Sequence, residues 1–379
     1  MKVIIAAGAL KHSLSATTTA DAIARGLRRS GLAAELVLLP IADGGNGTLD
    51  AFLAGNSEGR RLAVLVADPL GRLIEGTFGI AGETAVIEMA LASGLELLRD
   101  DELDPLRAST YGTGQLMQVA LEAGARRIIV GMGGSATVDG GAGCLQALGV
   151  RLLDAEGREL PAGIGGGSLH LIERIDAAGL NLRWREVEVV IASDVDNPAL
   201  GEEGAAAVFG PQKGANAEQV KTLEVNLRHY FTLVDEQLGI DVRTTRGGGA
   251  AGAFSAGLMA FLGGRIESGI DLILDLRGFD QQLANADLVI TSEGRMDAQT
   301  VHGKGPIGVA QRARQKEVPT VALVGGLDVD ETLLHEAGLW AALPIVNAPI
   351  PLEKALAQAE VLVEAAALRL GYLLQMDKK

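Results

Sequence analysis

Short runs of valine, isoleucine and leucine recur along the chain, and each is about as long as one buried β-strand. Apolar runs of this length between turn-forming residues are typical of strands in a parallel sheet that is covered on both faces. The runs predict strands at Lys2–Ala7, Ala34–Leu39, Arg127–Gly131, Val187–Ala192, Asp287–Thr291 and Thr320–Val324. Most of these strands lead into a glycine-rich or acidic turn.

A helical spacing of apolar residues appears between the strands. It predicts a helix at Ala16–Arg29, with Ser15 as its N-cap and Gly31 just past its end. It also predicts a helix at Thr113–Glu122 and a long one over residues 352–374. Strands that alternate with helices in this way predict an α/β fold with a mainly parallel sheet.

The segment 60–89 breaks this alternation. Its apolar pattern predicts three consecutive strands, Arg61–Ala67, Leu73–Gly79 and Thr84–Met89, which would form a β-meander. Both ends of the chain show βα units, whereas the middle is mixed. We therefore predict a discontinuous first domain made of residues 1–60 and 285–379, and a mixed α/β domain of residues 61–284 inserted into it.

Composition and charge narrow the class of protein. The 379 residues are 48% apolar, include 51 glycines and carry a net charge of −15. An acidic surface repels nucleic acids and anionic membranes, so we expect neither as a partner. The single cysteine, Cys144, excludes an intramolecular disulfide framework, and no apolar stretch is long enough for a membrane span. We expect a cytoplasmic protein.

Two glycine-rich segments follow predicted strands and suit anion binding. The first runs from Asp43 to Thr48, and the second from Gly131 to Gly141. Glycines allow backbone N–H groups to approach phosphate oxygens at the carboxyl ends of strands. The second segment fits neither the GxGxxG nor the GxxxxGK[ST] pattern. The alternatives are an Asp-Gly turn with a threonine cap at the first segment, and a purely structural turn at the second.

Charged residues follow two other strands. Asp194 and Asp196 come directly after a strand, and their i, i+2 spacing could let both carboxylates hold one Mg²⁺. The alternative is an Asx-turn before Pro198. Glu293, Arg295 and Asp297 follow the strand at 287–291 and could supply a base, an anion clamp and a metal ligand. A solvated loop with a local ion pair is the alternative there.

Three further residues could contact a ligand. Lys304 lies near the start of a predicted helix, where a cation suits phosphate contact. His302 precedes it and could equally be a surface or supporting histidine. Lys213, in the segment FGPQKG, is another cation beside a turn.

Taken in order, these segments resemble the bacterial glycerate kinase family over essentially the whole chain. The matching segments include LKHSLSA, ADGGNGT, GMGGSATVDGGAG, SDVDNPALG, GAAAVFGPQKGA, DLVITSEGRMDAQT and HGKGPIGVA. The resemblance implies a Rossmann-like or flavodoxin-like domain, a second mixed α/β domain and an active site between them. It also implies ATP with Mg²⁺ as the phosphoryl donor, D-glycerate as substrate and 2-phosphoglycerate as product. A homodimer is compatible with it.

The resemblance also suggests roles for individual residues. Lys11 and Arg295 would bind the substrate carboxylate or the transferring phosphoryl group, and Asp43, Glu293 or Asp297 would orient or deprotonate the attacking hydroxyl. Asp194 would act in catalysis and, with Asp196, would hold Mg²⁺. The predicted substrate- and nucleotide-binding residues are Gly44, Gly45, Thr48, Gly133, Gly134, Ser135, Thr137, Asp139, Lys213, His302 and Lys304.

Three segments depart from the pattern usual in the family. Gly8 and Ala9 stand where the family has Asp-Ser, Asn46 replaces a glutamate, and Ser292 replaces a glycine. The first two changes remove acidic groups near the expected phosphate site. They allow two alternatives: a kinase for a different small hydroxy acid, or a weakly active or non-catalytic relative that binds a metabolite.

Overall fold

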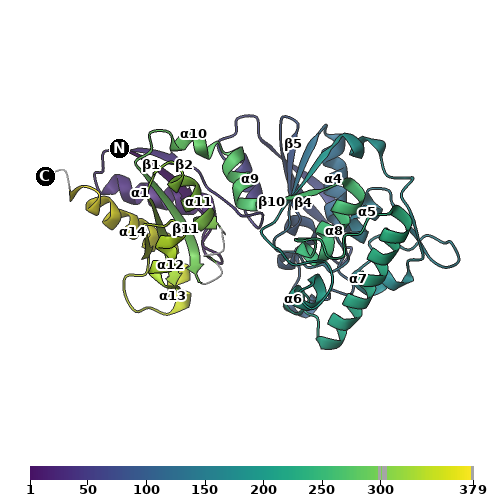
Figure 1. The fold of residues 1–379 in the computed structure, drawn as a ribbon. Helices are drawn as coiled ribbons and strands as arrows, with labels where there is room; N and C mark the ends of the chain where they lie inside the picture. Colours follow the sequence, from purple (N-terminus) through teal and green to yellow (C-terminus); the bar gives the residue numbers. More distant parts are fainter. Residues whose placement is uncertain (298–299, 301–304, 377–379) are drawn as a thin grey trace. The chain divides into compact units, whose positions relative to one another are not determined.

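A computed structural model describes residues 1–297, 300 and 305–376. The chain divides into two compact units (Figure 1). Unit 1 comprises Met1–Asp43, Asp50–Gly55 and Ile270–Lys379, and unit 2 comprises Gly44–Leu49 and Asn56–Gly269. The domain boundaries at 60/61 and 284/285 stay predictions. Within the described residues, we find no helix with the length and apolar character needed to cross a membrane.

Unit 1 is built on a five-stranded parallel sheet with the order β13-β12-β11-β1-β2. Its strands are β1 (Lys2–Ala7), β2 (Glu35–Leu38), β11 (Leu288–Met296), β12 (Thr320–Leu327) and β13 (Ala341–Pro344). In chain order the strands are arranged 2-1-3-4-5, as in flavodoxin-like folds. Ligands in such folds bind beyond the carboxyl ends of the strands at the switch point, which here lies between β1 and β11.

Helices cover both faces of this sheet. They are α1 (Ala16–Arg29), α9 (Gly269–Leu276), α10 (Phe279–Leu283), α11 (Gly305–Arg314), α12 (Glu331–Glu336), α13 (Leu352–Ala357) and α14 (Ala359–Leu373). On one face Ile5 and Ile290 pack with α1 and α14, which lie side by side (Figure 1). On the other face Ile4 and Val289 pack with α9, α10 and α11. The side chains of each strand therefore alternate between two apolar layers.

Arg312 joins the three helices on that second face. Its guanidinium makes a two-bond contact with Asp280, at 2.8 and 2.9 Å, and also pairs with Asp275 and Asp271. We expect Arg312→Met to lower the free energy of unfolding by about 1–2 kcal/mol, because three carboxylates lose their shared cation. Thermal or urea unfolding measures this loss. Arg28→Met, on an exposed part of α1, is the control, and an equally small effect of both changes would contradict the prediction.

Unit 2 contains a six-stranded mixed sheet with the order β10-β9-β6-β5-β4-β3. Its strands are β3 (Arg60–Ala67), β4 (Leu73–Ala81), β5 (Thr84–Glu88), β6 (Arg127–Gly131), β9 (Glu188–Ala192) and β10 (Arg265–Glu267). A separate pair consists of β7 (Arg151–Leu153) and β8 (Arg174–Asp176). Strands β5, β6, β9 and β10 are parallel, so their carboxyl ends share one edge. The antiparallel strands β3 and β4 lead into β5, which confirms the predicted meander.

The helices of unit 2 pack around two apolar clusters. They are α3 (Ala90–Ser93), α4 (Tyr111–Glu122), α5 (Ala142–Ala147), α6 (Ala205–Phe209), α7 (Ala217–Leu238) and α8 (Ala250–Leu262), with short 3-10 helices at Leu95–Leu97, Asp100–Glu102, Gly166–Leu171, Leu182–Glu186 and Pro211–Lys213. Another helix, α2 (Thr48–Leu53), begins in unit 2 and continues in unit 1.

Two predicted elements differ from the structure. The helix expected over residues 352–374 is wrong as a single element, because Gln358 has non-helical angles (φ −109°, ψ 12°) and separates α13 from α14. The strand expected to end at Thr291 instead continues to Met296, since its extension pairs with β12. The second difference matters for function because the extension contains Glu293 and Arg295.

Candidate functional site

Lys11 is a cation that lies just after the carboxyl end of β1, at the switch point of unit 1. Lys11 follows β1 in a tight turn, where the N–H groups of Ser13 and Leu14 both donate to the Leu10 carbonyl. His12 completes the turn in the left-handed region, at φ 66°. The Lys11 side chain is exposed, and its backbone lies beside Gly294 of β11. A cation is thus available where a flavodoxin-like fold binds its ligand.

Glu293 lies on the strand end next to this turn. It pairs with Val324 of β12, is half-buried, and accepts a hydrogen bond from the Thr300 hydroxyl at 3.1 Å. Burial raises the pKa of Glu293 to about 7; the Thr300 bond and the charge of Lys11 oppose this rise, and the charges of Asp43 and Asp297 add to it. Electrostatics therefore link four residues that the sequence predicted for one site. A carboxyl group that titrates near neutral pH can accept a proton in catalysis.

Arg295 and Asp297, two other predicted residues of this segment, each have a partner other than Glu293. Arg295 is exposed and pairs with Asp328, while the Asp297 N–H donates to the Thr300 hydroxyl oxygen at 3.2 Å. His302 and Lys304 lie outside the described residues. Arg295 keeps a solvent-facing guanidinium whose present partner is an equally exposed carboxylate. Such a pair contributes little to stability and can be exchanged for a ligand at small cost.

Two of the unusual positions contact each other. The Ser292 hydroxyl donates to the Gly8 carbonyl oxygen at 2.8 Å. A Cβ atom on residue 8 would lie 2.7 Å from the Ser292 carbonyl oxygen, closer than real contacts allow. Glycine at position 8 is therefore required by the close approach of β11, and an aspartate could not simply be restored there.

In unit 2 the two glycine-rich segments lie against each other. The Gly133 N–H donates to the Gly44 carbonyl at 3.1 Å, and a Cβ atom on Gly133 would lie 2.5 Å from the Gly45 Cα. A Cβ atom on Gly131 would be 2.7 Å from the Gly44 oxygen. The backbones approach so closely only because these residues lack side chains. The structure thus joins the segments that the sequence proposed separately as anion-binding loops.

Gly134 and Ser135 supply two backbone donors in this pair of loops. Gly134 is exposed, with φ 75°, and precedes Ser135, which is buried. In the described part of the chain, neither the Gly134 nor the Ser135 N–H donates to a protein acceptor. Successive N–H groups beside a left-handed residue form a concave site for an anion. This arrangement favours the anion-binding interpretation over the purely structural turn.

Other predicted ligand-binding residues are buried behind the loops. The Thr48 hydroxyl donates to the Gly45 carbonyl at 2.6 Å. The Asp139 carboxylate accepts from the Thr110 N–H and hydroxyl and from the N–H groups of Gly141 and Gly143. Burial raises the pKa of Asp139, and these four bonds oppose the rise. The side chains of Thr48 and Asp139 thus hold the loops in shape.

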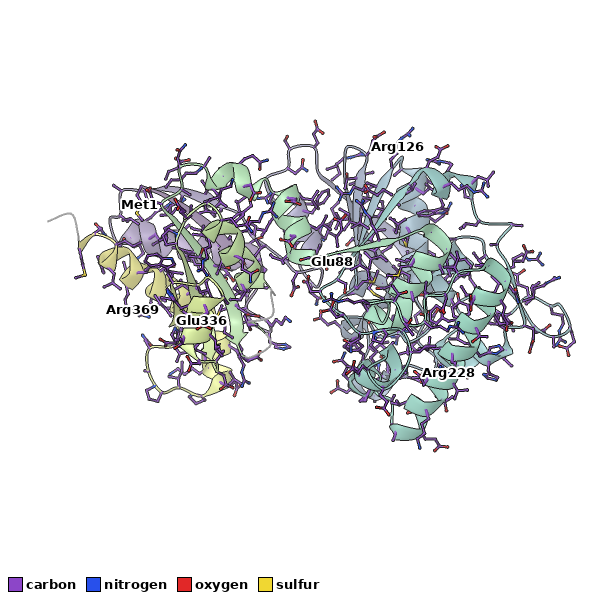
Figure 2. The ribbon with its side chains drawn as sticks, viewed as in Figure 1. Met1, Glu88, Arg126, Arg228, Glu336 and Arg369 are labelled. Carbon is purple, nitrogen blue, oxygen red and sulfur yellow. The ribbon has the colours of Figure 1, made fainter. Side chains whose placement is uncertain are left out.

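Glu88 is a residue of this region that no sequence motif singled out. It ends β5, where it is in register with Gly131 of β6, and only 5% of it is exposed (labelled in Figure 2). Its Oε1 atom accepts from the Leu49 N–H at 2.6 Å, in the first turn of α2. A carboxylate that ends an otherwise apolar strand was the available signal. Glu88 holds the loop at Gly44–Leu49 in position.

The two predicted metal ligands have different partners. Asp194 Oδ1 accepts from the Gly269 N–H at 3.1 Å, whereas Asp196 is exposed and forms a two-bond pair with Arg246 at 2.8 and 2.7 Å. Across residues 1–297, 300 and 305–376, we find no cluster of three metal-ligating side chains. Mg²⁺ in nucleotide sites usually needs only one or two carboxylates besides phosphate oxygens and water. Asp196 would have to leave Arg246 before it could take such a role.

These features define an α/β protein with a candidate ligand site at the switch point of a parallel sheet, where burial raises the pKa of Glu293 to about 7, and with a candidate anion-binding loop. The chain belongs to the glycerate kinase family, whose sequence profile matches residues 3–375.

Individual relatives match over nearly their full length. The glycerate kinase of Bacillus subtilis (strain 168) is 45% identical, covering 100% of this chain and 99% of the relative. The glycerate 2-kinase of Escherichia coli (strain K12) is 44% identical, covering 94% of this chain and 93% of the relative. A crystal structure assigned as glycerate kinase 2 of Salmonella typhimurium LT2 superposes with a TM-score of 0.88 at 42% identity, covering 100% of this chain and 99% of that one. The two-domain α/β fold is confirmed.

Proposed function

We propose that this protein transfers the γ-phosphoryl group of ATP to D-glycerate and forms 2-phosphoglycerate in the cytoplasm. Family membership and the names of the relatives support the reaction class and the acid. The observation that carries the proposal is Glu293, whose pKa is raised to about 7 beside Lys11. A hydroxy acid needs both a cation for its carboxylate and a base for its hydroxyl, and these two side chains supply them.

The proposed reaction is a direct in-line transfer. Lys11 binds the glycerate carboxylate, and Glu293 accepts the proton of the 2-hydroxyl as that oxygen attacks the γ-phosphorus. The bond between the γ-phosphorus and the bridging oxygen breaks, and ADP leaves. Such a transfer depends on positioning and charge neutralisation more than on covalent participation by the protein. Among the three carboxylates that the sequence left open, Glu293 is chosen because its proton affinity suits neutral pH. Asp43 and Asp297 then act through their negative charge.

We assign the nucleotide phosphates to the loop at Gly133–Ser135, where the N–H groups of Gly134 and Ser135 would donate to anionic oxygens. Asp194 is the carboxylate that would hold Mg²⁺, together with the phosphates. When bound, Mg²⁺ would neutralise part of the negative charge of the phosphates. Arg295 can exchange its exposed partner Asp328 for the transferring group.

A kinase for a different small hydroxy acid is the second candidate. The observation that favours it is that a Cβ atom on residue 8 would collide with the Ser292 carbonyl oxygen, so Gly8 offers no side chain to a ligand beside the Lys11 turn. Coupled ADP release with D-glycerate, tartronate, erythronate and lactate separates the candidates. We expect D-glycerate to have the highest kcat/KM. A higher value for another acid would support the second candidate, and ligand-induced thermal stabilisation without turnover would identify a non-catalytic binding protein.

The pH dependence of turnover follows from the raised pKa of Glu293. Only the carboxylate form can accept a proton, so activity requires loss of the proton that Glu293 holds below about pH 7. At saturating MgATP we expect kcat/KM for D-glycerate to rise about tenfold per pH unit below pH 7 and then to level off. The residual activity of Glu293→Gln should lack this limb. A flat wild-type profile between pH 5.5 and 8 would rule out Glu293 as the base.

A further inference from the structure

Lys213 is a fully buried cation directly behind the proposed phosphate loop. It ends the 3-10 helix Pro211–Lys213, only 2% of it is exposed, and its Nζ donates to Ser135 Oγ and to the Thr137 carbonyl oxygen, both at 2.7 Å. Burying an ammonium group is costly unless it is hydrogen-bonded, so its presence here calls for a role. Burial lowers the pKa of Lys213 to about 7, against the charge of Asp139. The negative charge of a bound phosphate would favour the protonated form.

A strained turn supports the same loop from another side. Ala251, Gly252 and Ala253 have φ angles of 55°, 69° and 65°, and the Gly252 carbonyl accepts from the Gly140 N–H at 3.1 Å. A left-handed conformation costs about 1–2 kcal/mol for each alanine. A Cβ atom on Gly252 would lie only 2.0 Å from the Thr137 oxygen. A buried ammonium, a buried carboxylate and a strained turn thus converge on one loop, as is typical of a preorganised site.

The contact with Lys213 determines what Ser135 can do. A protonated amine only donates, so Ser135 Oγ accepts from Lys213 and its own hydrogen is left to donate elsewhere. That hydrogen belongs to the same residue whose N–H, like that of Gly134, donates to no acceptor in the described part of the chain. The three donors together suit a phosphate oxygen. Lys213 itself is buried behind the loop, so its ammonium group is not one of these donors.

We propose that Lys213 is a positioning residue that orients the Ser135 hydroxyl to donate to a nucleotide phosphate, without touching the ligand itself. This inference rests on the proposed kinase function. It replaces the expectation that Lys213 binds the nucleotide directly. In this proposal Lys213 affects nucleotide binding through Ser135, so removing either side chain should have the same consequence as removing both.

A double-mutant cycle with Ser135→Ala, Lys213→Met and the double variant tests the inference, with Lys221→Met on the exposed side of α7 as the matched control. Each single variant should raise KM for MgATP about tenfold, the effect of one hydrogen bond to a charged group. The double variant should be no worse than either single variant, and KM for D-glycerate should stay unchanged. Multiplied effects, or an unchanged KM for MgATP in Lys213→Met, would overturn the inference.

Calorimetric titration with ADP provides a readout that does not need turnover. We expect the same non-additive loss in the Kd for ADP, with thermal unfolding close to that of the control. Coupled losses of ADP binding in a protein that does not phosphorylate D-glycerate would support this inference and contradict the proposed function. Normal turnover in the wild type, together with additive effects of the two substitutions, would support the proposed function and contradict this inference.

Discussion

Replacing Glu293 with glutamine should lower kcat for glycerate phosphorylation by about 100- to 10,000-fold, the usual contribution of a general base. Glutamine keeps the shape of the side chain and can still contact the Thr300 hydroxyl, but it cannot accept a proton. The loss should therefore appear in kcat, with KM for D-glycerate and for MgATP little changed. Steady-state kinetics with coupled ADP detection measures it.

The same substitution should not weaken the fold, and this separates catalysis from unfolding. The pKa of Glu293 is raised from 4.5 to about 7 in the folded protein, so folding favours the protonated form. The contribution of Glu293 to stability is then complete below pH 4.5 and is lost as the pH rises through 7. Glutamine does not titrate, so the variant does not lose stability in this way as the pH rises. The Tm of Glu293→Gln minus the Tm of the wild type should therefore be larger at pH 8 than at pH 5.

Glu353→Gln is the matched control, since Glu353 is exposed at the start of α13. It should leave kcat and the pH dependence of Tm unchanged. Full activity of Glu293→Gln would remove Glu293 from the mechanism and return the choice of base to Asp43 and Asp297.

Replacing Gly133 with alanine should lower kcat/KM for MgATP by about 100-fold, the scale expected when reacting groups are misplaced by about 1 Å. The new Cβ atom would lie 2.5 Å from the Gly45 Cα, and a backbone atom cannot move aside as a side chain can. The two loops must separate, and the hydrogen bond from the Gly133 N–H to Gly44 is strained or lost. Nucleotide binding should suffer first, since Lys11 and Glu293 belong to the other unit.

The control for this substitution is Gly239→Ala. Gly239 ends α7 with φ 72° and no neighbouring atom within 4 Å of a Cβ, so the change costs about 1 kcal/mol of stability without touching the loops. Its kinetics should match the wild type. If Gly133→Ala also keeps its wild-type kcat/KM, the pair of loops does not bind the nucleotide.

Local patterns in the sequence predicted individual elements well. The helix at Ala16–Arg29 was predicted to the residue, because Ser15, the apolar spacing and the glycine after it all agree. The N-cap bond from the Thr18 N–H to Ser15 is present at 3.1 Å. Elements that depend on distant partners were harder. The extension of β11 to Met296 is polar and forms only because β12 pairs with it.

The same distinction applies to the site. The sequence pointed to Glu293, Lys11, Asp43 and Asp297 as candidates for one site, and the structure relates them through the raised pKa of Glu293. It could not show that Lys213 is buried, because a lysine beside a turn is usually exposed. Nor could it explain Gly8, whose missing side chain reflects the close approach of Ser292 from a strand 284 residues away in the chain.

The most direct test of the account is to incubate the purified, folded protein with MgATP and D-glycerate and to identify the product by ³¹P NMR, beside Glu293→Gln under the same conditions. The wild type should form ADP and 2-phosphoglycerate in equal amounts, and the variant should do so at a rate at least about 100-fold lower. No glycerate-dependent phosphoryl transfer by the wild type, or equal rates for the two proteins, would contradict the account.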